Sequence, residues 1–260
     1  MSLKLFFIGF TLTLCTTAYS DNNCSEEVFQ TVGKHVGIKN FSSSTEDDQG
    51  IVVQNTCKTW PYHPEITLAA FVYTRDNSRP DVKSVMIAMI DNKTKKITHS
   101  FNKIIEEDAV TEFGSLRFDT AKYQLKPNLR AIGVRFYSSA RGASCGEAYW
   151  NNQLILFVPE KTTLRPILSL YTEQEQSLQG CLGVPSENSI WEDAKLSISL
   201  KNTLHNSFTE LKITAKIEPS FAENAADSLA RSAPHVAALT LFTPRVEARE
   251  YGKLIDLEFF

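Results

Sequence analysis

The chain has 260 residues and a formal net charge of −3, with 22% charged and 10% aromatic residues. A mildly acidic chain without a basic cluster is not typical of proteins that bind nucleic acid or an anionic membrane surface. Beyond the N-terminal region, no segment approaches the roughly 20 apolar residues that a membrane-spanning helix needs. The length is sufficient for a single domain with one large core.

The first twenty residues predict a secretory signal peptide. Lys4 is followed by the apolar run 5–15 and then by the small-x-small ending Ala18-Tyr19-Ser20. A positive charge, a short apolar segment and small residues at the cleavage site are the three parts of such a signal. We therefore expect cleavage after Ser20 and a periplasmic or secreted protein made of residues 21–260.

Four cysteines would remain after this cleavage: Cys24, Cys57, Cys145 and Cys181. An even number in an oxidising compartment predicts two disulfides, although four cysteines allow three pairings. Pairing Cys24 with Cys57 and Cys145 with Cys181 would close two loops of similar size. A metal site or a catalytic thiol is the alternative, but the sequence has no CxxC motif, so we predict structural disulfides and no metal.

The first predicted elements after the signal are a short helix, a loop and a strand. Ser25 is the expected N-cap of the helix, two acidic residues follow it, and Phe29 and Val32 lie on its apolar side. The polar segment 41–50 predicts a loop, and 51–53 predicts a short strand.

The segment Cys57-Lys58-Thr59-Trp60-Pro61-Tyr62-His63-Pro64 predicts a rigid corner, because its two prolines restrict the backbone. Trp60, Tyr62 and His63 have two interpretations. They form an aromatic platform for a ligand, or they form a plug in which the disulfide and the indole cap the first strand of the sheet. The composition favours the plug.

The stretch 84–101 predicts a β-hairpin. Its first arm, Val85 to Ile90, is uninterruptedly apolar, as expected of a strand covered on both faces, and its second arm alternates apolar and polar residues. The same pattern recurs at 154–170 and at 195–217. Pro166 cannot donate a backbone hydrogen bond, so its strand is expected at an edge of the sheet. Further strands are expected at 66–73, 115–119, 129–137, 236–242 and 254–260.

Two other segments have distinct predictions. The loop 138–151 carries Cys145, Tyr149 and Trp150, and its aromatic residues either contact a partner or form the lid of a core. Ser220 and Glu223 form a capping box before the alanine-rich segment 222–231, which predicts a peripheral helix.

The sequence contains no recognisable catalytic motif. It has no HExxH, no GxSxG, no P-loop and no GxGxxG after a strand, and its five histidines are scattered. Ser144 has no assigned base, and Cys145 is better explained as half of a disulfide. The acidic run 106–108 is interpreted as surface residues. We therefore predict no catalytic residue and no cofactor.

Four segments resemble a group of uncharacterised exported bacterial proteins: CKTWPYHPEITLAAF, VMIAMIDNKTKKI, LRFDTAKYQL and LILFVPEKTTLRPIL. The resemblance covers residues 57–170, with weaker agreement at 195–217. Its motifs are a CKxWP corner and a DTAxYxL segment, the latter being 119–125 in this chain. The resemblance implies an exported bacterial protein and implies no activity.

These observations predict an all-β fold of antiparallel hairpins, arranged as a β-sandwich or a small propeller-like array, with one or two short peripheral helices. Residues 21–260 form one exported domain, with an alternative boundary near 172–194. The expected function is that of a non-catalytic binding protein, such as an immunity or inhibitor protein, whose partner is another exported or envelope protein. The alternative is a hydrolase of envelope polymers that uses carboxylates from separate strands, such as Glu106, Asp119 or Glu147.

Overall fold

The structure is a computed structural model that describes residues 23–43, 51–75, 82–105, 114–138, 145–182, 189–221, 235–241 and 257–258. Over these residues the chain forms one helix and twelve strands, which confirms the all-β class. The elements are α1 (Glu26–Val36), β1 (Val52–Trp60), β2 (His63–Thr74), β3 (Lys83–Asp91), β4 (Lys96–Ile105), β5 (Leu116–Lys126), β6 (Leu129–Phe136), β7 (Ala148–Glu160), β8 (Thr163–Gln179), β9 (Ile190–His205), β10 (Phe208–Phe221), β11 (His235–Leu241) and β12 (Leu257–Glu258).

The strands belong to a single hydrogen-bonded sheet that turns back on itself. Eight of them follow the order β1-β2-β3-β4-β8-β7-β6-β5, while β9 pairs with β8 and β10, and β11 pairs with β10. The pairing is antiparallel except for one parallel bridge between Ser100 of β4 and Thr163 of β8. The two ends of the eight-strand path meet, because Lys58 Nζ of β1 donates a hydrogen bond to Thr120 Oγ1 of β5 at 2.9 Å. The sheet is therefore nearly closed.

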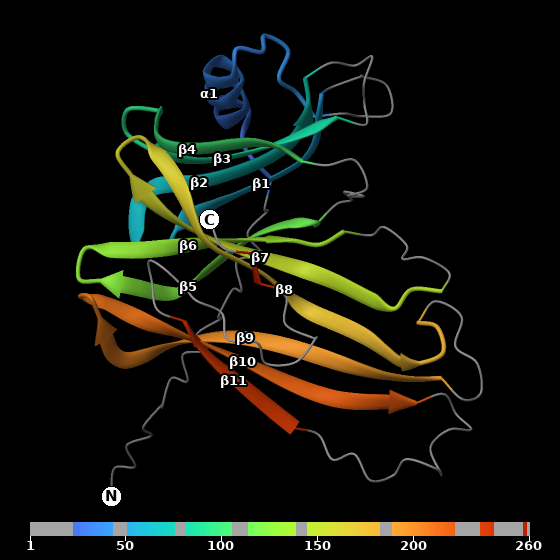
Figure 1. The fold of residues 1–260 in the computed structure, drawn as a ribbon. Coiled ribbons are helices and arrows are strands. Elements are labelled where there is room, and N and C mark those ends of the chain that lie inside the picture. The colour runs from blue at the N-terminus through green and yellow to red at the C-terminus, as the bar shows by residue number, and fades with distance from the viewer. Residues whose placement is uncertain are drawn as a thin grey trace, which may run out of the picture.

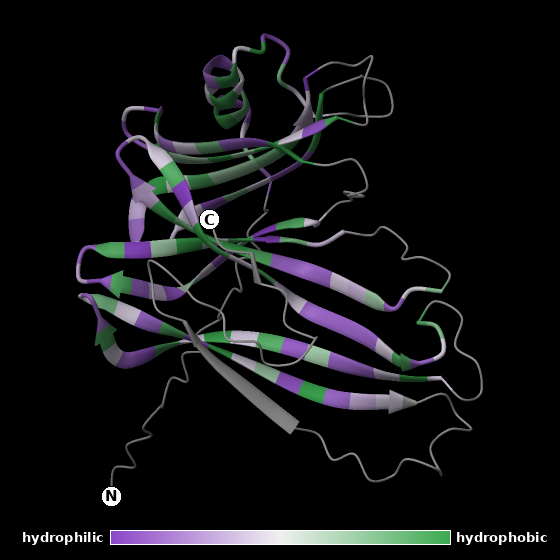
Figure 2. Ribbon diagram, viewed as in Figure 1, coloured by the Kyte–Doolittle hydropathy of each residue, from purple (hydrophilic) through white to green (hydrophobic). Residues whose placement is uncertain are grey.

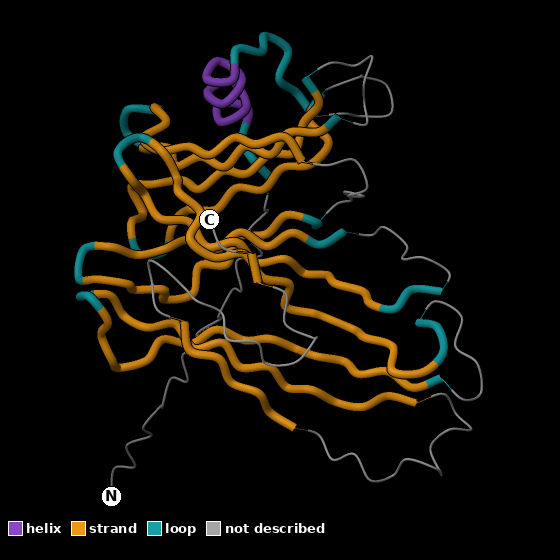
Figure 3. The backbone as a smooth tube through the Cα atoms, in the orientation of Figure 1, coloured by secondary structure: helices purple, strands orange, loops and turns teal. Residues whose placement is uncertain are grey.

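The strands stack in layers, as in a sandwich, but the layers are continuous with one another. In Figure 1, α1 lies over β1–β4, the β5–β8 layer lies beneath these strands, and β9–β11 form the layer farthest from α1. Figure 3 shows the same path as a tube, with β8 running between the layers. β8 joins the layers because it pairs with β7 along most of its length, with β4 at its start and with β9 near its end.

Three hydrophobic cores fill the spaces between these layers. The first lies between α1 and the outer face of β2 and β3, the second between the β1–β4 layer and β5–β7, and the third between β5–β8 and the strands β9 and β10. Apolar residues accordingly recur along the strands of these layers in Figure 2.

The predicted hairpin at 84–101 is confirmed as β3 and β4. Within β3, Ile87 and Met89 belong to the second core, whereas Met86, Ala88 and Ile90 belong to the first. Because successive side chains of a strand point to opposite faces, burial on both faces requires an uninterrupted apolar run. The hairpins at 154–170 and 195–217 are also present, as β7–β8 and β9–β10, and their strands are longer than predicted.

The predicted N-terminal helix is confirmed as α1. Ser25 holds the N-cap position, although its side chain makes no capping hydrogen bond, and Gly37 ends the helix with φ 77°. Phe29 and Val32 are buried, as predicted. Phe29 meets Phe71 of β2 edge to face, with ring centroids 5.1 Å apart.

Both disulfides are present, and the pairing is Cys24 with Cys57 and Cys145 with Cys181. The first disulfide joins the residues before α1 to β1. The second joins the segment before β7 to the end of β8, where Leu182 N also donates to Gly146 O.

Two local predictions need correction. The expected corner at 57–64 is only a two-residue turn, because Cys57 and Trp60 lie in β1 and Trp60 pairs with His63. The strand of Pro166 is not an edge strand, since β8 has neighbours on both sides. Pro166 is accommodated because it lies beside an irregularity in the β7–β8 register, and no described residue pairs with it on its other side.

The C-terminal predictions are met in part. Segments 236–242 and 254–260 contain β11 and the two-residue β12, which pair with β10 and β8. Ser220 is in β10, and its hydroxyl donates a hydrogen bond to Asp193 Oδ2. The predicted helix at 222–231, the signal peptide at 1–20 and the acidic run at 106–108 all lie outside the described residues. In the described part of the chain, no helix has the length and apolar character needed to cross a membrane.

Candidate functional site

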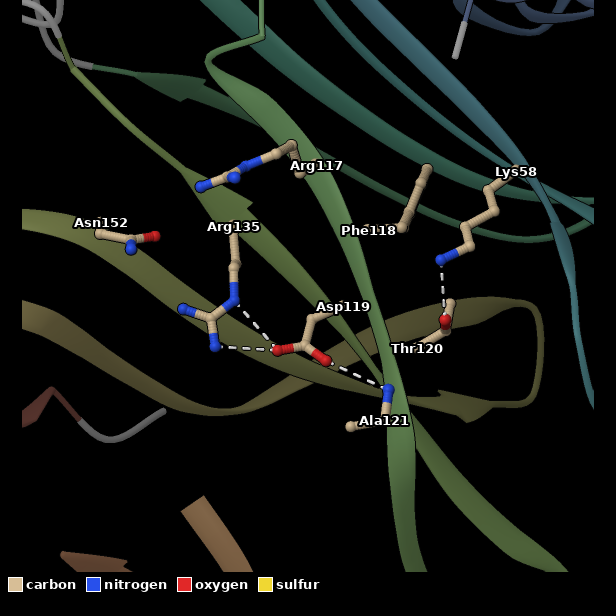
Figure 4. Close-up of a pocket in the computed structure, with 8 residues that line it drawn as sticks. All are labelled: Lys58, Arg117, Phe118, Asp119, Thr120, Ala121, Arg135 and Asn152. Carbon is tan, nitrogen blue, oxygen red and sulfur yellow. Dashed lines mark hydrogen bonds and ion pairs between the residues drawn. The ribbon is translucent and has the colours of Figure 1, made fainter. Parts of the chain in front are cut away.

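A pocket of about 570 Å³ opens at the edge formed by β5, close to the place where the sheet nearly closes. Figure 4 shows its lining residues, which come from β1, β5, β6 and β7. They are Lys58, Arg117, Phe118, Asp119, Thr120, Ala121, Arg135 and Asn152.

A bulge in β5 shapes this pocket. Asp119 pairs with Gly133 of β6 and Tyr123 pairs with Ala131, so β5 has two more residues than β6 over this interval. The Ala121 backbone N–H donates to Asp119 Oδ1 at 3.1 Å and closes the extra loop. A bulge of this kind turns side chains away from the regular alternation of a strand. The predicted strand at 115–119 therefore continues through the bulge to residue 126.

Gly133 allows the bulge to lie close to β6. A Cβ atom at this position would be 2.8 Å from Asp119 Cβ and 3.0 Å from Leu154 Cδ1. Both distances are shorter than ordinary van der Waals contact, so the absence of a side chain at Gly133 is what lets Asp119 lie against β6.

Asp119 is the acceptor at the centre of a hydrogen-bond network. Its Oδ2 atom accepts from Arg135 Nη2 at 2.9 Å, from Arg135 Nε at 3.0 Å and from the hydroxyl of Tyr123 at 3.1 Å. Arg135 Nη1 also donates to Thr172 Oγ1 of β8 at 3.2 Å. Burial, followed by the charge of Asp119, raises the pKa of Tyr123, so its hydroxyl remains a donor at neutral pH. The network fixes both the carboxylate and Arg135.

Arg117 is the guanidinium of this pocket that Asp119 does not neutralise. It lies directly opposite Arg135 in the β5–β6 register, and it is exposed. Among the described residues, Arg117 has no ion pair or hydrogen bond. In Figure 4 the side chains of Arg117 and Arg135 lie on the same side of β5 as Asn152. Like charges directly opposite each other on a sheet are unfavourable, so this arrangement is suited to an added anion.

Lys58 and Thr120 lie on the other side of β5 in Figure 4. Their hydrogen bond joins two segments that are far apart in the chain, Cys57 to Pro61 and Asp119 to Leu125. These segments are two of the motifs on which the expected resemblance was based. They therefore meet at one place in the fold, at the edge of the pocket.

The chemistry of the lining residues is that of a binding site for an oxyanion. Lys58, Arg117 and Arg135 carry positive charge, and Asp119 carries the one carboxylate among the lining residues that the structure describes. Guanidinium groups bind carboxylates and phosphates with charge-assisted hydrogen bonds. Within the described residues, no cluster of three His, Cys, Asp or Glu side chains could hold a metal ion.

The predicted residues of the first turn do not form a single exposed platform. Trp60 is buried in the second core, with its ring centroid 4.8 Å from that of His63. His63 Nδ1 lies 3.0 Å from Glu65 Oε1 at the surface. Tyr62 is exposed and lies over the guanidinium of Arg130.

Tyr149 and Trp150 lie at the start of β7. Trp150 is exposed and stacks on Tyr171, with centroids 6.4 Å apart, while Asn151 Nδ2 donates to the Tyr149 hydroxyl at 2.7 Å. Trp150 lies three residues before Gln153, which pairs with Phe136 at the end of β6, whereas Arg130, which Tyr62 covers, lies near the start of β6. At about 3.3 Å per residue, Trp150 and Tyr62 are therefore on the order of 30 Å apart along the strands. They form two separate surfaces.

The three carboxylates considered for hydrolysis are also separated. Asp119 lies in the pocket and is bound to Arg135, whereas Glu147 is exposed ahead of β7. Glu106 lies outside the described residues.

Sequence reasoning missed Arg117 and Arg135. The available signal was their position on strands, since Arg135 continues the face of Ala131 and Gly133 and Arg117 shares a face with Asp119. A charged residue on an otherwise apolar face indicates a partner across the sheet, but the register that supplies this partner depends on the bulge. Comparison of the chain with protein-family models, with curated proteins and with solved structures returns no match.

Proposed function

We propose that this protein is a non-catalytic binding protein that acts outside the cytoplasm and accepts an anionic group of a partner protein in the pocket at the β5 bulge. The observation that carries this proposal is Arg117, which lies opposite Arg135 and has no neutralising partner among the described residues. An acidic side chain inserted beside Arg117 would relieve the repulsion between the two guanidinium groups.

The state of Asp119 favours binding over turnover. A general base must be able to receive a proton from a substrate within hydrogen-bonding reach. In this pocket Asp119 Oδ2 accepts three hydrogen bonds and Oδ1 accepts the Ala121 N–H. We therefore assign Asp119 the role of positioning Arg135.

The proposed location is the periplasm or the exterior of a bacterial cell. Its support is the pair of disulfides, which persist in oxidising compartments, together with the signal sequence predicted from residues 1–20. A partner in the same compartment would be another exported or envelope protein. An immunity or inhibitor protein acts by binding alone and needs no catalytic residues, so this is the role we propose.

The proposal is tested with the oxidised protein and poly-L-glutamate as the anionic polypeptide, by titration calorimetry at low and moderate salt. Arg117→Glu should weaken binding at least about tenfold, because it removes one charge-assisted interaction and adds a repulsion. Lys96→Glu, which makes the same charge change at an exposed residue of the β3–β4 hairpin, is the matched control and should have little effect.

The same three proteins are then used as bait in a periplasmic extract of the host. A partner retained by the wild type and by Lys96→Glu, and lost with Arg117→Glu, supports the proposal. Equal losses with the two variants would show that only net charge matters, and would overturn it. Absence of binding to poly-L-glutamate at millimolar concentration would also overturn it.

A further inference from the structure

Arg130, near the start of β6, is a buried positive charge that no carboxylate of the described residues neutralises. Its residue is 8% exposed, and its Nε atom is sealed from solvent without a hydrogen-bond partner. Within the part of the chain that the structure describes, Arg130 has no ion pair and no hydrogen bond. Buried arginines are normally paired with a carboxylate, so this side chain requires an explanation.

The contact that Arg130 does make is with an aromatic ring. Its Cζ atom lies 3.4 Å from the centroid of the Tyr62 ring, and Tyr62 itself is 45% exposed in the two-residue turn between β1 and β2. A cation–π contact recovers only part of the hydration that a buried guanidinium loses.

The polar residue opposite Arg130 does not supply a partner. Gln124 pairs with Arg130 across β5 and β6, but its Nε2 atom donates to the backbone carbonyls of Lys126 at 2.6 Å and Pro127 at 3.1 Å. Its amide holds the β5–β6 turn. Glu65, a carboxylate of the adjoining β1–β2 hairpin, lies 3.0 Å from His63 Nδ1 and makes no ion pair with Arg130.

We propose that Arg130 and Tyr62 form a binding site for a carboxylate that a partner protein supplies. Tyr62 is the aromatic wall of this site and Arg130 is its charge. Because the Tyr62 ring covers one face of the guanidinium, a ligand must approach in the guanidinium plane, along an edge. Carboxylates and phosphates both bind a guanidinium edge with two parallel hydrogen bonds. A tetrahedral phosphate also places oxygens outside this plane, on the side of the Tyr62 ring, so the planar carboxylate is the better fit.

The site opens through Tyr62. Nε is sealed in the structure, and the exposed side chain that lies against the guanidinium is Tyr62, so we assign the opening of the Nε edge to a movement of Tyr62. Replacing Tyr62 by a small residue should therefore make the guanidinium easier to reach. This site does not rest on the proposed function, because it shares no residue with the pocket at Arg117.

The test is a nuclear magnetic resonance titration of the oxidised protein labelled with ¹⁵N-arginine. The Nε–H signal of Arg130 is assigned by its loss in Arg130→Lys and is then followed with acetate, with a tetraglutamate peptide, with phosphate and with chloride at matched ionic strength. We expect a saturable shift of this signal with acetate and with the peptide, and a smaller one with phosphate. Tyr62→Ala should bind acetate several-fold more tightly, and Arg117→Gln should leave the shift unchanged.

Three results would overturn the proposal. They are an Arg130 signal that no carboxylate shifts at 100 mM, a shift that chloride reproduces, and tighter binding of phosphate than of acetate. Because the main measurement uses the wild-type protein, a variant that fails to fold does not affect it. Loss of poly-L-glutamate binding in Arg117→Glu with an intact Arg130 shift would support both sites independently.

Discussion

Arg117 and Arg135 lie directly opposite each other on β5 and β6, and of these two arginines only Arg135 pairs with the carboxylate of Asp119. The side chain of Asp119 is 15% exposed and that of Arg135 is 27% exposed, so this ion pair is largely shielded from solvent. The pocket thus combines a neutralised, fixed guanidinium with a second one that remains open to a ligand.

Replacing Asp119 by Asn should destabilise the protein by about 2–4 kcal/mol, because it leaves Arg135 shielded and unneutralised beside Arg117. The free energy of unfolding is measured by urea denaturation of the oxidised protein. Glu160→Gln, which breaks the exposed pair with Arg165, is the control and should cost less than about 1 kcal/mol. Similar losses in the two variants would contradict the central role of Asp119.

Gly133→Ala tests the close approach of the bulge to β6. The added methyl group would meet Asp119 Cβ at 2.8 Å and should cost about 1–3 kcal/mol through overpacking. The Nε–H resonance of Arg135 should shift, because Asp119 is pushed away from it. Gly114→Ala, at φ +86° with open space around it, strains the backbone only and should leave that resonance in place. An unchanged Arg135 signal in Gly133→Ala would refute the argument.

Truncation of Trp60 should destabilise the protein much more than truncation of Trp150. Trp60 is 5% exposed in the second core, so Trp60→Ala should cost about 3–5 kcal/mol of unfolding free energy. Trp150 is 44% exposed and stacks on one ring, so Trp150→Ala should cost about 1 kcal/mol or less. Thermal and urea denaturation measure both losses. A small effect at Trp60 would mean that it does not plug the core.

The elements that local patterns specify could be predicted from the sequence. The uninterrupted run from Val85 to Ile90 requires apolar surroundings on both faces, and α1 and the β5–β7 strands supply them. The hairpin predicted at 195–217 turns at Asn206 and Ser207, both with positive φ, as a tight hairpin turn requires. The apolar and polar pattern of a strand and the residue types of a tight turn depend only on residues close together in the sequence, so both can be predicted from it.

The pairing of distant strands could not be predicted in the same way. β4 lies beside β8, and β1 lies against β5, because the sheet turns back on itself, and no local pattern encodes either contact. The pocket depends on both the register of β5 with β6 and the closure of β1 onto β5. For this reason the sequence predicted the aromatic residues Trp60 and Tyr62 as candidates. It did not predict Arg117 of β5 and Arg135 of β6.

The two disulfides should contribute nearly equally to stability. They join residues separated by 33 and 36 positions, and loop-closure entropy for this length is worth about 3–4 kcal/mol for each bond. Replacing Cys24 and Cys57 by Ser, and separately Cys145 and Cys181, should therefore cause similar losses in urea denaturation. Because the bonds lie in different parts of the fold, the losses should add in the fourfold variant. A combined loss far from the sum would show that the two regions are coupled.

The outer face of β8–β10 should make stability depend on pH through two carboxyl groups with opposite shifts. Glu175 lies directly across from Asp193. Loss of hydration on the sheet, then the charges of Asp193 and Glu173, raises the pKa of Glu175. By contrast, the hydrogen bond and charge of Lys216 lower the pKa of Glu218.

These directions fix the sign of each effect. A raised pKa means that the folded state holds the Glu175 proton more tightly than the unfolded state, so ionisation of Glu175 costs stability as the pH rises above 4.5 and through the folded pKa. Glu175→Gln should therefore raise the melting temperature at pH 7 and leave it unchanged at pH 3. The lowered pKa of Glu218 contributes stability that is complete above 4.5 and is lost as the pH falls through the folded pKa. Glu218→Gln should lower the melting temperature at pH 7, and its effect should shrink as the pH falls below 4.5. Melting curves of the two variants at neutral pH should therefore diverge from the wild type in opposite directions. Divergence in the same direction would contradict the assigned repulsion at Glu175.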